Sequence, residues 1–79
     1  MTGASVRRHS VTLQGHRTSI SLEDAFWRRL QAIATRRGLS INALVAEIDA
    51  ARAEGGDIEG NLSSALRVYV LEDAIRSGR

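Results

Sequence analysis

The first third of the chain alternates between apolar and polar positions. Val11 and Leu13 are separated by one polar residue, and Ile20 follows the same rhythm after Thr18. Successive side chains of a strand point to opposite faces, so this spacing predicts half-buried strands. The elements expected here are a flexible arm at 1–5 and strands at about 6–13 and 17–22.

The period then changes to that of a helix. Phe26, Leu30 and Ile33 recur every three or four residues, and Gly38 is a typical helix stop. Ser40 and Asn61 are suitable N-caps for two further helices. The helices expected are about 23–37, 40–54 and 62–77, the last with Leu62, Ala65, Leu66, Tyr69 and Val70 on one side. One domain over 6–79 follows.

The size of the chain indicates a partner. A domain of 79 residues buries little surface and is usually held by disulfides, a metal or a second chain. There is no cysteine and there are only two histidines, so oligomerisation remains. We expect an obligate homodimer in which folding and association are one step. The residues assigned to its shared core are Ile20, Leu22, Phe26, Leu30, Leu44, Val45 and Ile48.

Charge is unevenly distributed along the chain. The net charge is +2, yet residues 1–40 hold seven arginines against two acids, whereas residues 41–79 hold four against seven. The front half is therefore a candidate anion-binding surface. All basic residues are arginine, which suits bidentate contacts to phosphate or guanine. A genome rich in G and C produces the same arginine preference.

The residues that could carry other chemistry form no recognisable site. His9 and His16 have no carboxylate or nucleophile at a telling spacing, so we expect no catalytic residue, metal site or cofactor. The glycine-rich stretch 55–60 lacks the ligands of a calcium or phosphate loop and is interpreted as a connector. No apolar run approaches the roughly 20 residues of a membrane span, and no apolar stretch follows the first arginines. We expect a cytoplasmic protein without a membrane partner.

One segment resembles a known family. The ribbon-helix-helix superfamily is similar over about 16–53, through Ile20-Ser21-Leu22-Glu23, then Phe26, Leu30 and Ala34, then Arg37-Gly38-Leu39-Ser40 before an apolar helix. The string from Gly15 to Glu23, with Phe26-Trp27 and the later Asn61-Leu62-Ser63-Ser64-Ala65-Leu66-Arg67, more narrowly resembles a little-characterised bacterial subfamily. This resemblance implies an α+β, mainly helical fold. It is an intertwined homodimer, here with an extra N-terminal strand and a third, C-terminal helix.

The resemblance also implies a function. In that family a strand pairs with its copy from a second subunit, and the ribbon enters the major groove of DNA as part of a small transcription regulator. The base-contacting residues would be Arg17, Ser19 and Ser21, although three polar residues are also the ordinary wet face of a strand. The phosphate-contacting residues would be Ser40, Ile41 and Asn42 at a helix start, with Arg7 and Arg8. Ser40 is equally a plain cap.

An intrachain hairpin complicates this mode. If Gly15-His16 is the turn, Leu13 lies opposite Thr18 and Val11 opposite Ile20, all on one face. Two such hairpins joined through a central ribbon would span about 15 Å, which exceeds the groove width of about 12 Å. The alternative function is therefore a protein-interaction or dimerisation module that does not bind DNA. An ordered, paired first strand favours that module, and a free basic arm favours DNA.

The expected partners follow from these two functions. They are a second copy, with higher oligomers on DNA, double-stranded DNA, and an unidentified protein under the alternative.

Overall fold

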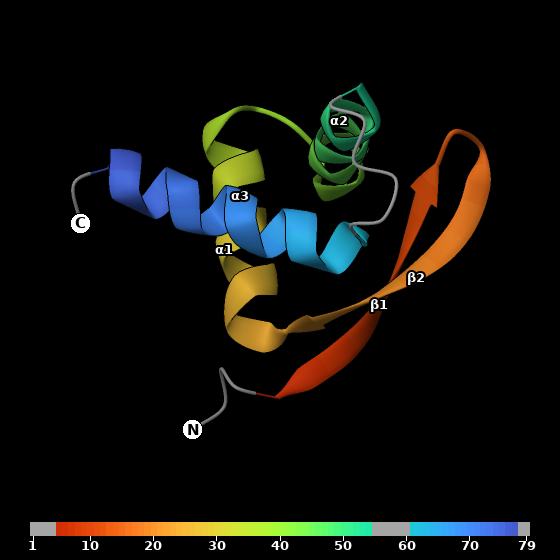
Figure 1. The fold of residues 1–79 in the computed structure, drawn as a ribbon, viewed down its shortest axis with the longest axis horizontal. Coiled ribbons are helices and arrows are strands. Elements are labelled where there is room, and N and C mark those ends of the chain that lie inside the picture. The colour runs from red at the N-terminus through yellow and green to blue at the C-terminus, as the bar shows by residue number, and fades with distance from the viewer. Residues whose placement is uncertain (1–4, 55–60, 78–79) are drawn as a thin grey trace.

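A β-hairpin lies along one side of three helices in the computed structural model (Figure 1). The structure describes residues 5–54 and 61–77. Its elements are β1 (Val6–Leu13), β2 (His16–Glu23), α1 (Asp24–Arg36), α2 (Ile41–Glu54) and α3 (Leu62–Arg76). This order confirms the expected mainly helical α+β fold with an extra first strand and a third helix. The expected arm, apart from Ser5, and the connector at 55–60 lie outside the described residues.

The turn between the strands is formed by Gln14 and Gly15. Both residues have positive φ, 53° and 80°, as the type I′ turn of a two-residue hairpin requires. The sequence placed this turn one residue later, at Gly15-His16, and that placement is wrong. Glycine adopts positive φ freely, whereas a side chain at Gln14 makes the same conformation costly.

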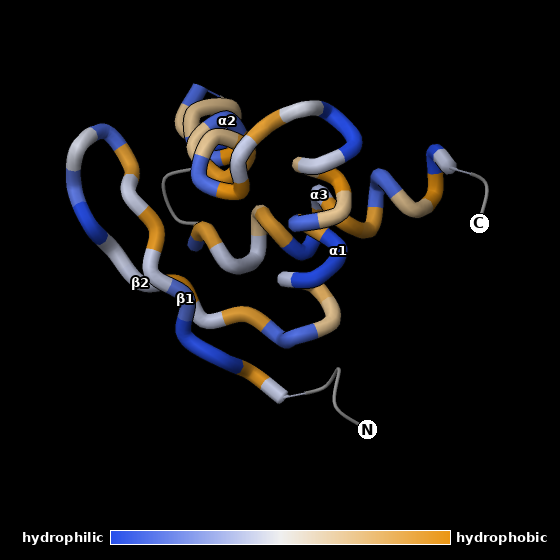
Figure 2. Tube along the Cα trace, turned by 180° about the vertical axis from the view of Figure 1, so that it is seen from behind, coloured by the Kyte–Doolittle hydropathy of each residue, from blue (hydrophilic) through white to orange (hydrophobic). Residues whose placement is uncertain are grey.

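The register of the hairpin follows from the turn. The observed pairs include Leu13 with His16, Val11 with Thr18 and His9 with Ile20. The predicted pairs, Leu13 with Thr18 and Val11 with Ile20, are therefore wrong, because moving the turn by one residue moves the register by two. An even shift keeps every side chain on its expected face. Figure 2 shows hydrophobic positions separated by hydrophilic ones in part of each strand.

The inner face of the hairpin closes one core with all three helices. Leu66 and Val70 of α3 are 0% and 7% exposed and fill the space between the sheet and the first two helices. The other buried apolar residues are Val11, Ile20 and Leu22 of the hairpin, Leu30, Ile33 and Ala34 of α1, and Leu44, Val45 and Ile48 of α2.

Six of the seven residues assigned to a dimer core are thus buried within one chain, and Phe26 is half-buried. From the sequence we expected these residues to be shared between two chains. In the structure, β1 and α3 of the same chain cover these residues. A dimer that shares these residues would need one of those elements to move away.

Local signals set the ends of the helices. After α1, the N–H of Leu39 donates to the carbonyl of Ala34 at 2.8 Å and that of Gly38 to Thr35 at 3.1 Å. With Gly38 at φ +72°, these bonds form a Schellman motif. Ser40 Oγ accepts from Ala43 N–H at 3.0 Å, and Asn61 caps α3 in the same way at 2.8 Å. Both N-caps were predicted from the sequence.

Ion pairs join α3 to α1. Asp73 is 4% exposed, and its Oδ1 accepts from Arg36 Nη2 at 2.6 Å while Arg29 lies 4.0 Å from Oδ2. The hydrogen bond from Arg36 holds the pKa of Asp73 below its ordinary value, against the opposing effect of burial. A buried carboxylate needs such a partner, so this contact orients α3 on α1.

A second cluster joins α1, α2 and α3. Arg37 donates to both carboxylate oxygens of Glu47, at 2.7 and 3.1 Å, and to the hydroxyl of Tyr69 at 3.2 Å. The bonds from Arg37 lower the pKa of Glu47.

A ring stack holds the hairpin on α1 from its inner side. The centres of the His9 and Trp27 rings lie 3.9 Å apart, and the ring planes are 10° from parallel.

Candidate nucleic-acid interface

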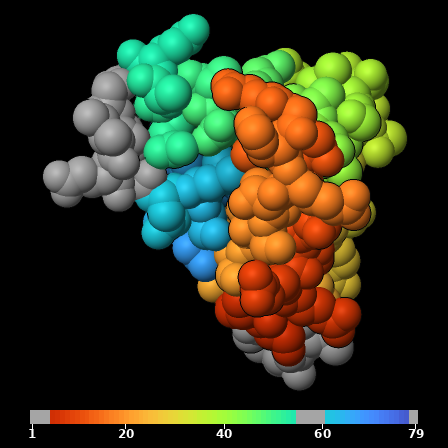
Figure 3. Space-filling model, turned by 90° about the vertical axis from the view of Figure 1, so that its right-hand side faces the viewer, coloured from red at the N-terminus to blue at the C-terminus, as the bar shows by residue number. Residues whose placement is uncertain are grey.

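The face of the hairpin turned away from the helices is entirely polar at its centre. Arg17, Ser19 and Ser21 lie on it, each exposed, as the alternation predicted. The pairing places Thr12, Ser10 and Arg8 directly across from them. We call the six residues Arg8, Ser10, Thr12, Arg17, Ser19 and Ser21 the hairpin outer face. Figure 3 shows both strands uncovered on this side of the molecule.

Sequence reasoning missed two members of this face. Ser10 and Thr12 were seen only as spacers between apolar residues, although a two-residue turn puts them on the same face as Ser19 and Arg17. Arg8, expected as a phosphate contact, shares the face with the base-contacting set. All six residues carry a hydroxyl or a guanidinium group, so the whole face can hydrogen-bond to base edges or phosphate.

The electrostatics of the face are positive. Within the described residues, Arg8 and Arg17 form no ion pair, so both guanidinium groups are available to an anion. The acid at the end of the face is neutralised, because Glu23 accepts from Arg67 Nε at 2.8 Å. That hydrogen bond lowers the pKa of Glu23 and keeps it ionised and paired.

Arg7 does not belong to the hairpin outer face. It pairs with Leu22 across the strands, and its side chain lies 3.7 Å from Asp24 at the start of α1. Adjacent strand residues point to opposite faces, so Arg7 and Arg8 cannot both contact one duplex from the same side. The structure therefore separates two residues that the sequence analysis grouped as phosphate contacts.

The start of α2 lies against the edge of β1. Asn42 Oδ1 accepts from the N–H of Thr12 at 3.4 Å. Ser40 is occupied as a cap, and the N–H groups of Ile41 and Asn42 lie outside the helical ladder, as at any helix start. Of the three residues expected at a phosphate, Ser40, Ile41 and Asn42, the last is thus brought to the edge of β1 at Thr12, which pairs with Arg17.

The other edge of the hairpin is partly covered. Ser63, in the first turn of α3, donates its hydroxyl to the carbonyl of Ser21 at 2.7 Å. A hollow of about 370 Å³ runs along this edge, lined by β2, the end of α2 and the start of α3. A strand pairing with β2 would have to displace Ser63 from the carbonyl of Ser21.

Across 5–54 and 61–77, no group of three or more His, Asp or Glu side chains could hold a metal ion. Across these same ranges, no helix is long and apolar enough to cross a membrane. His16 is exposed beside the turn, and His9 is engaged with Trp27. The hairpin outer face and the start of α2 are therefore retained as the candidate interface.

Comparison with known proteins identifies the family. A family model described as a ribbon-helix-helix domain matches residues 6–74. The chain belongs to the ribbon-helix-helix domain family. A solved structure, that of an uncharacterized protein from Bordetella pertussis Tohama I, is similar with a TM-score of 0.86 and 30% identity, over 98% of this chain and 62% of that one. The present chain thus spans less than two thirds of that relative. A search of curated proteins finds no match.

Membership confirms the resemblance found in the sequence. Ribbon-helix-helix domains typically bind DNA as dimeric regulators and are generally not enzymes. In the present structure β1 and β2 of the same chain form a two-stranded ribbon, and the family model covers both strands.

Proposed function

We propose that this ribbon-helix-helix protein is a dimeric cytoplasmic transcription regulator that inserts its hairpin, outer face first, into the major groove of double-stranded DNA. The observation that carries the proposal is the uncovered, two-stranded ribbon within a single chain. Strand axes in such a ribbon lie about 5 Å apart, so it fits a groove about 12 Å wide. Catalysis has no part in this function.

Each group on the hairpin outer face has a role in this proposal. Arg17 donates hydrogen bonds from both of its terminal nitrogens to a guanine, and Ser19 and Ser21 contact neighbouring base edges. Arg8 supplies a second cation from the opposite strand. The first N–H groups of α2 bind a phosphate at the groove edge, where the helix dipole favours an anion.

From the sequence, we noted that two hairpins joined through a central ribbon would form a sheet of four strands, which is wider than the major groove. Such a sheet forms only when a second copy adds its β2 to the β2 edge, where Ser63 already bonds to Ser21. A single hairpin that enters the groove alone avoids the problem. This proposal therefore keeps β2 unpaired on that side.

A protein-interaction module remains the second candidate. The ordered pairing of β1 is the outcome that the sequence analysis associated with this function. Val68, Leu71 and Ile75 of α3 are also large, apolar and more than half exposed, as at protein interfaces. The first candidate is preferred because the hairpin outer face is basic and uncovered.

Fluorescence anisotropy of labelled duplexes, random and from upstream of the gene, tests the proposal at several salt concentrations. We expect binding that weakens with salt, with a slope of about −0.9 for each phosphate contacted, and that is tighter for one sequence. Arg8→Ala with Arg17→Ala should abolish sequence preference, whereas Arg76→Ala in the last turn of α3 should not. Absence of binding at low salt would leave the interaction module as the function.

A further inference from the structure

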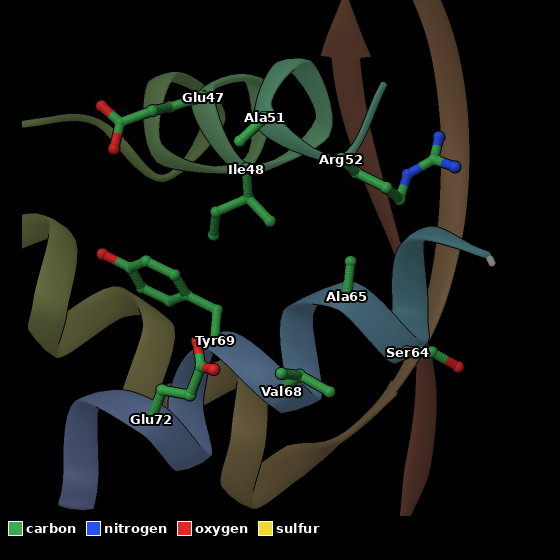
Figure 4. A pocket seen from close by; sticks show the side chains of 9 residues that line it. All are labelled: Glu47, Ile48, Ala51, Arg52, Ser64, Ala65, Val68, Tyr69 and Glu72. Atoms are coloured by element: carbon green, nitrogen blue, oxygen red, sulfur yellow. The ribbon is translucent and has the colours of Figure 1, made fainter. Parts of the chain in front are cut away.

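A hollow of about 390 Å³ lies between α2 and α3, and we call it the α2–α3 hollow. Ile48 and Ala51 line it from α2, and Ala65 and Val68 line it from α3 (Figure 4). A hollow of this volume, with apolar walls and a few polar groups, is typical of a site for a small organic molecule. None of its lining residues belongs to the hairpin outer face, so the two sites are separate.

The polar groups of the α2–α3 hollow gather at its two ends. Figure 4 shows Glu47, Tyr69 and Glu72 at one end and Arg52 and Ser64 at the other. A ligand that fills the hollow therefore has an apolar body between two polar ends, and the charges at these ends decide which ligand fits.

One end of the α2–α3 hollow is held in place by Arg37. This residue donates to both carboxylate oxygens of Glu47, at 2.7 and 3.1 Å, and to the hydroxyl of Tyr69, at 3.2 Å. Across the described ranges the Tyr69 hydroxyl accepts this bond and donates none, so its proton and a lone pair remain for a ligand. Groups that are fixed before a ligand arrives lower the ordering cost of binding.

The uncompensated charge of the α2–α3 hollow is negative. Its charged lining residues are Glu47, Arg52 and Glu72. Glu47 pairs with Arg37 at 2.7 Å, and Arg52 pairs with Asp49 at 2.8 Å. Glu72 is exposed and forms no ion pair in the part of the chain that the structure describes. Charge complementarity therefore favours a ligand that carries a positive charge at the end where Glu72 lies.

We propose that the α2–α3 hollow binds a small hydrophobic organic cation, an amine with an aromatic or aliphatic body. The ammonium group donates to the carboxylate of Glu72 and to the oxygen of Tyr69, whose ring also attracts a cation. The body packs on Ile48 and Val68 and removes their apolar surface from water. This site goes beyond the proposed function, and its binding is measured without DNA, so either can fail alone.

Titration of isotope-labelled protein with phenylbutylamine, followed by nuclear magnetic resonance, tests the site. We expect saturable shifts confined to the backbone amides of 47–52 and 64–72, with a dissociation constant of about 1 mM or lower. Phenylbutyrate has the same body and the opposite charge, so it should bind at least about fivefold more weakly. The absence of saturable shifts, or equal binding of the two probes, would overturn the proposal.

Two neighbouring alanines of α2 test the location. Ala51 lines the α2–α3 hollow and Ala50 does not, and both are exposed. Ala51→Phe should fill the hollow and weaken binding of phenylbutylamine at least about tenfold, because the body of the ligand loses its buried contacts. Ala50→Phe should leave binding unchanged. Circular dichroism melts check that both variants are folded, and equal effects of the two would place the amine elsewhere.

A matched pair of glutamates tests the choice of charge. Glu72→Gln should lessen the preference for phenylbutylamine over phenylbutyrate by about two- to fivefold. Glu54→Gln, at an exposed residue of α2 that does not line the α2–α3 hollow, should retain the full preference. A preference that is the same in both variants would contradict recognition of a cation by Glu72.

Discussion

The N–H of Thr12 donates to the side-chain oxygen of Asn42 across 3.4 Å, and this contact ties the hairpin to the first turn of α2. Thr12 also faces Arg17 across the strands. One residue of β1 therefore separates the candidate base-reading arginine from the candidate phosphate-binding helix start. In the proposed complex, a single duplex meets both within a short distance.

Arg17→Ala should weaken binding to a preferred sequence by about 1–3 kcal/mol, because a bidentate contact to guanine is lost. The fold should be unaffected, since Arg17 is exposed and forms no ion pair in the described ranges. Anisotropy titrations of preferred and random duplexes measure the effect, with Arg76→Ala as the control. Equal losses on both duplexes would make Arg17 a phosphate contact instead.

Leu66→Ala should lower the free energy of unfolding by about 2–5 kcal/mol, because Leu66 is fully buried where α3 completes the core. Urea unfolding followed by circular dichroism measures this loss.

A related expectation follows from a core completed within one chain. At concentrations where sedimentation velocity shows a monomer, the protein should still unfold in one cooperative thermal transition. A protein that is unfolded whenever it is monomeric would show that folding itself needs a second copy.

Gln14→Asn should stabilise the hairpin by a few tenths to about 1 kcal/mol. Gln14 is held at a φ of 53°, and asparagine followed by glycine is the preferred sequence of a type I′ turn. Gln14→Ala, which lacks this preference, is the matched control. Thermal melts compare the three proteins, and a lower melting temperature for Gln14→Asn would argue against the observed turn.

Stability should fall on acidification, in part through Asp73. Its pKa is lowered by the hydrogen bond from Arg36. A carboxyl with a lowered pKa stabilises the fold above its unfolded value of about 3.9, and the contribution is lost as pH falls through the folded pKa.

Asp73→Asn should therefore melt at a lower temperature than the wild type at pH 7, and the difference should narrow in acid. Glu54→Gln, at the exposed end of α2, serves as the control. Melting curves from neutral to strongly acidic pH test this, and a constant difference would show that the ionised form of Asp73 does not matter.

Local patterns were sufficient to predict much of this fold. Ser40 and Asn61 cap the helices as expected, and the stripe containing Leu66 and Val70 faces the core, because caps and helical period depend on neighbouring residues. The partner of Asp73 lies 37 residues away, and no local rule joins the two. Nor did the local pattern anticipate that α3 would cover the residues assigned to a dimer core.

The candidate site was predictable only in part. Alternation alone was enough to place Arg17, Ser19 and Ser21 on one face. Which residues of β1 join them depends on the turn, and Gln14 at positive φ is not a choice that propensity favours. The neighbourhood of Asn42 and Thr12 depends on how α2 packs on β1, which only the tertiary structure fixes.

The hairpin outer face is nearly symmetric, and that symmetry reaches the DNA. A ribbon made of two copies of one strand has dyad symmetry and reads a palindrome at its centre. Here a two-fold axis at the pair of Ser10 and Ser19 relates Arg8 to Arg17 and Thr12 to Ser21, so one chain carries an approximate dyad of its own. If it binds as proposed, the bases under one hairpin form a short, nearly palindromic element. Any larger inverted repeat in the operator then reports the arrangement of two whole proteins.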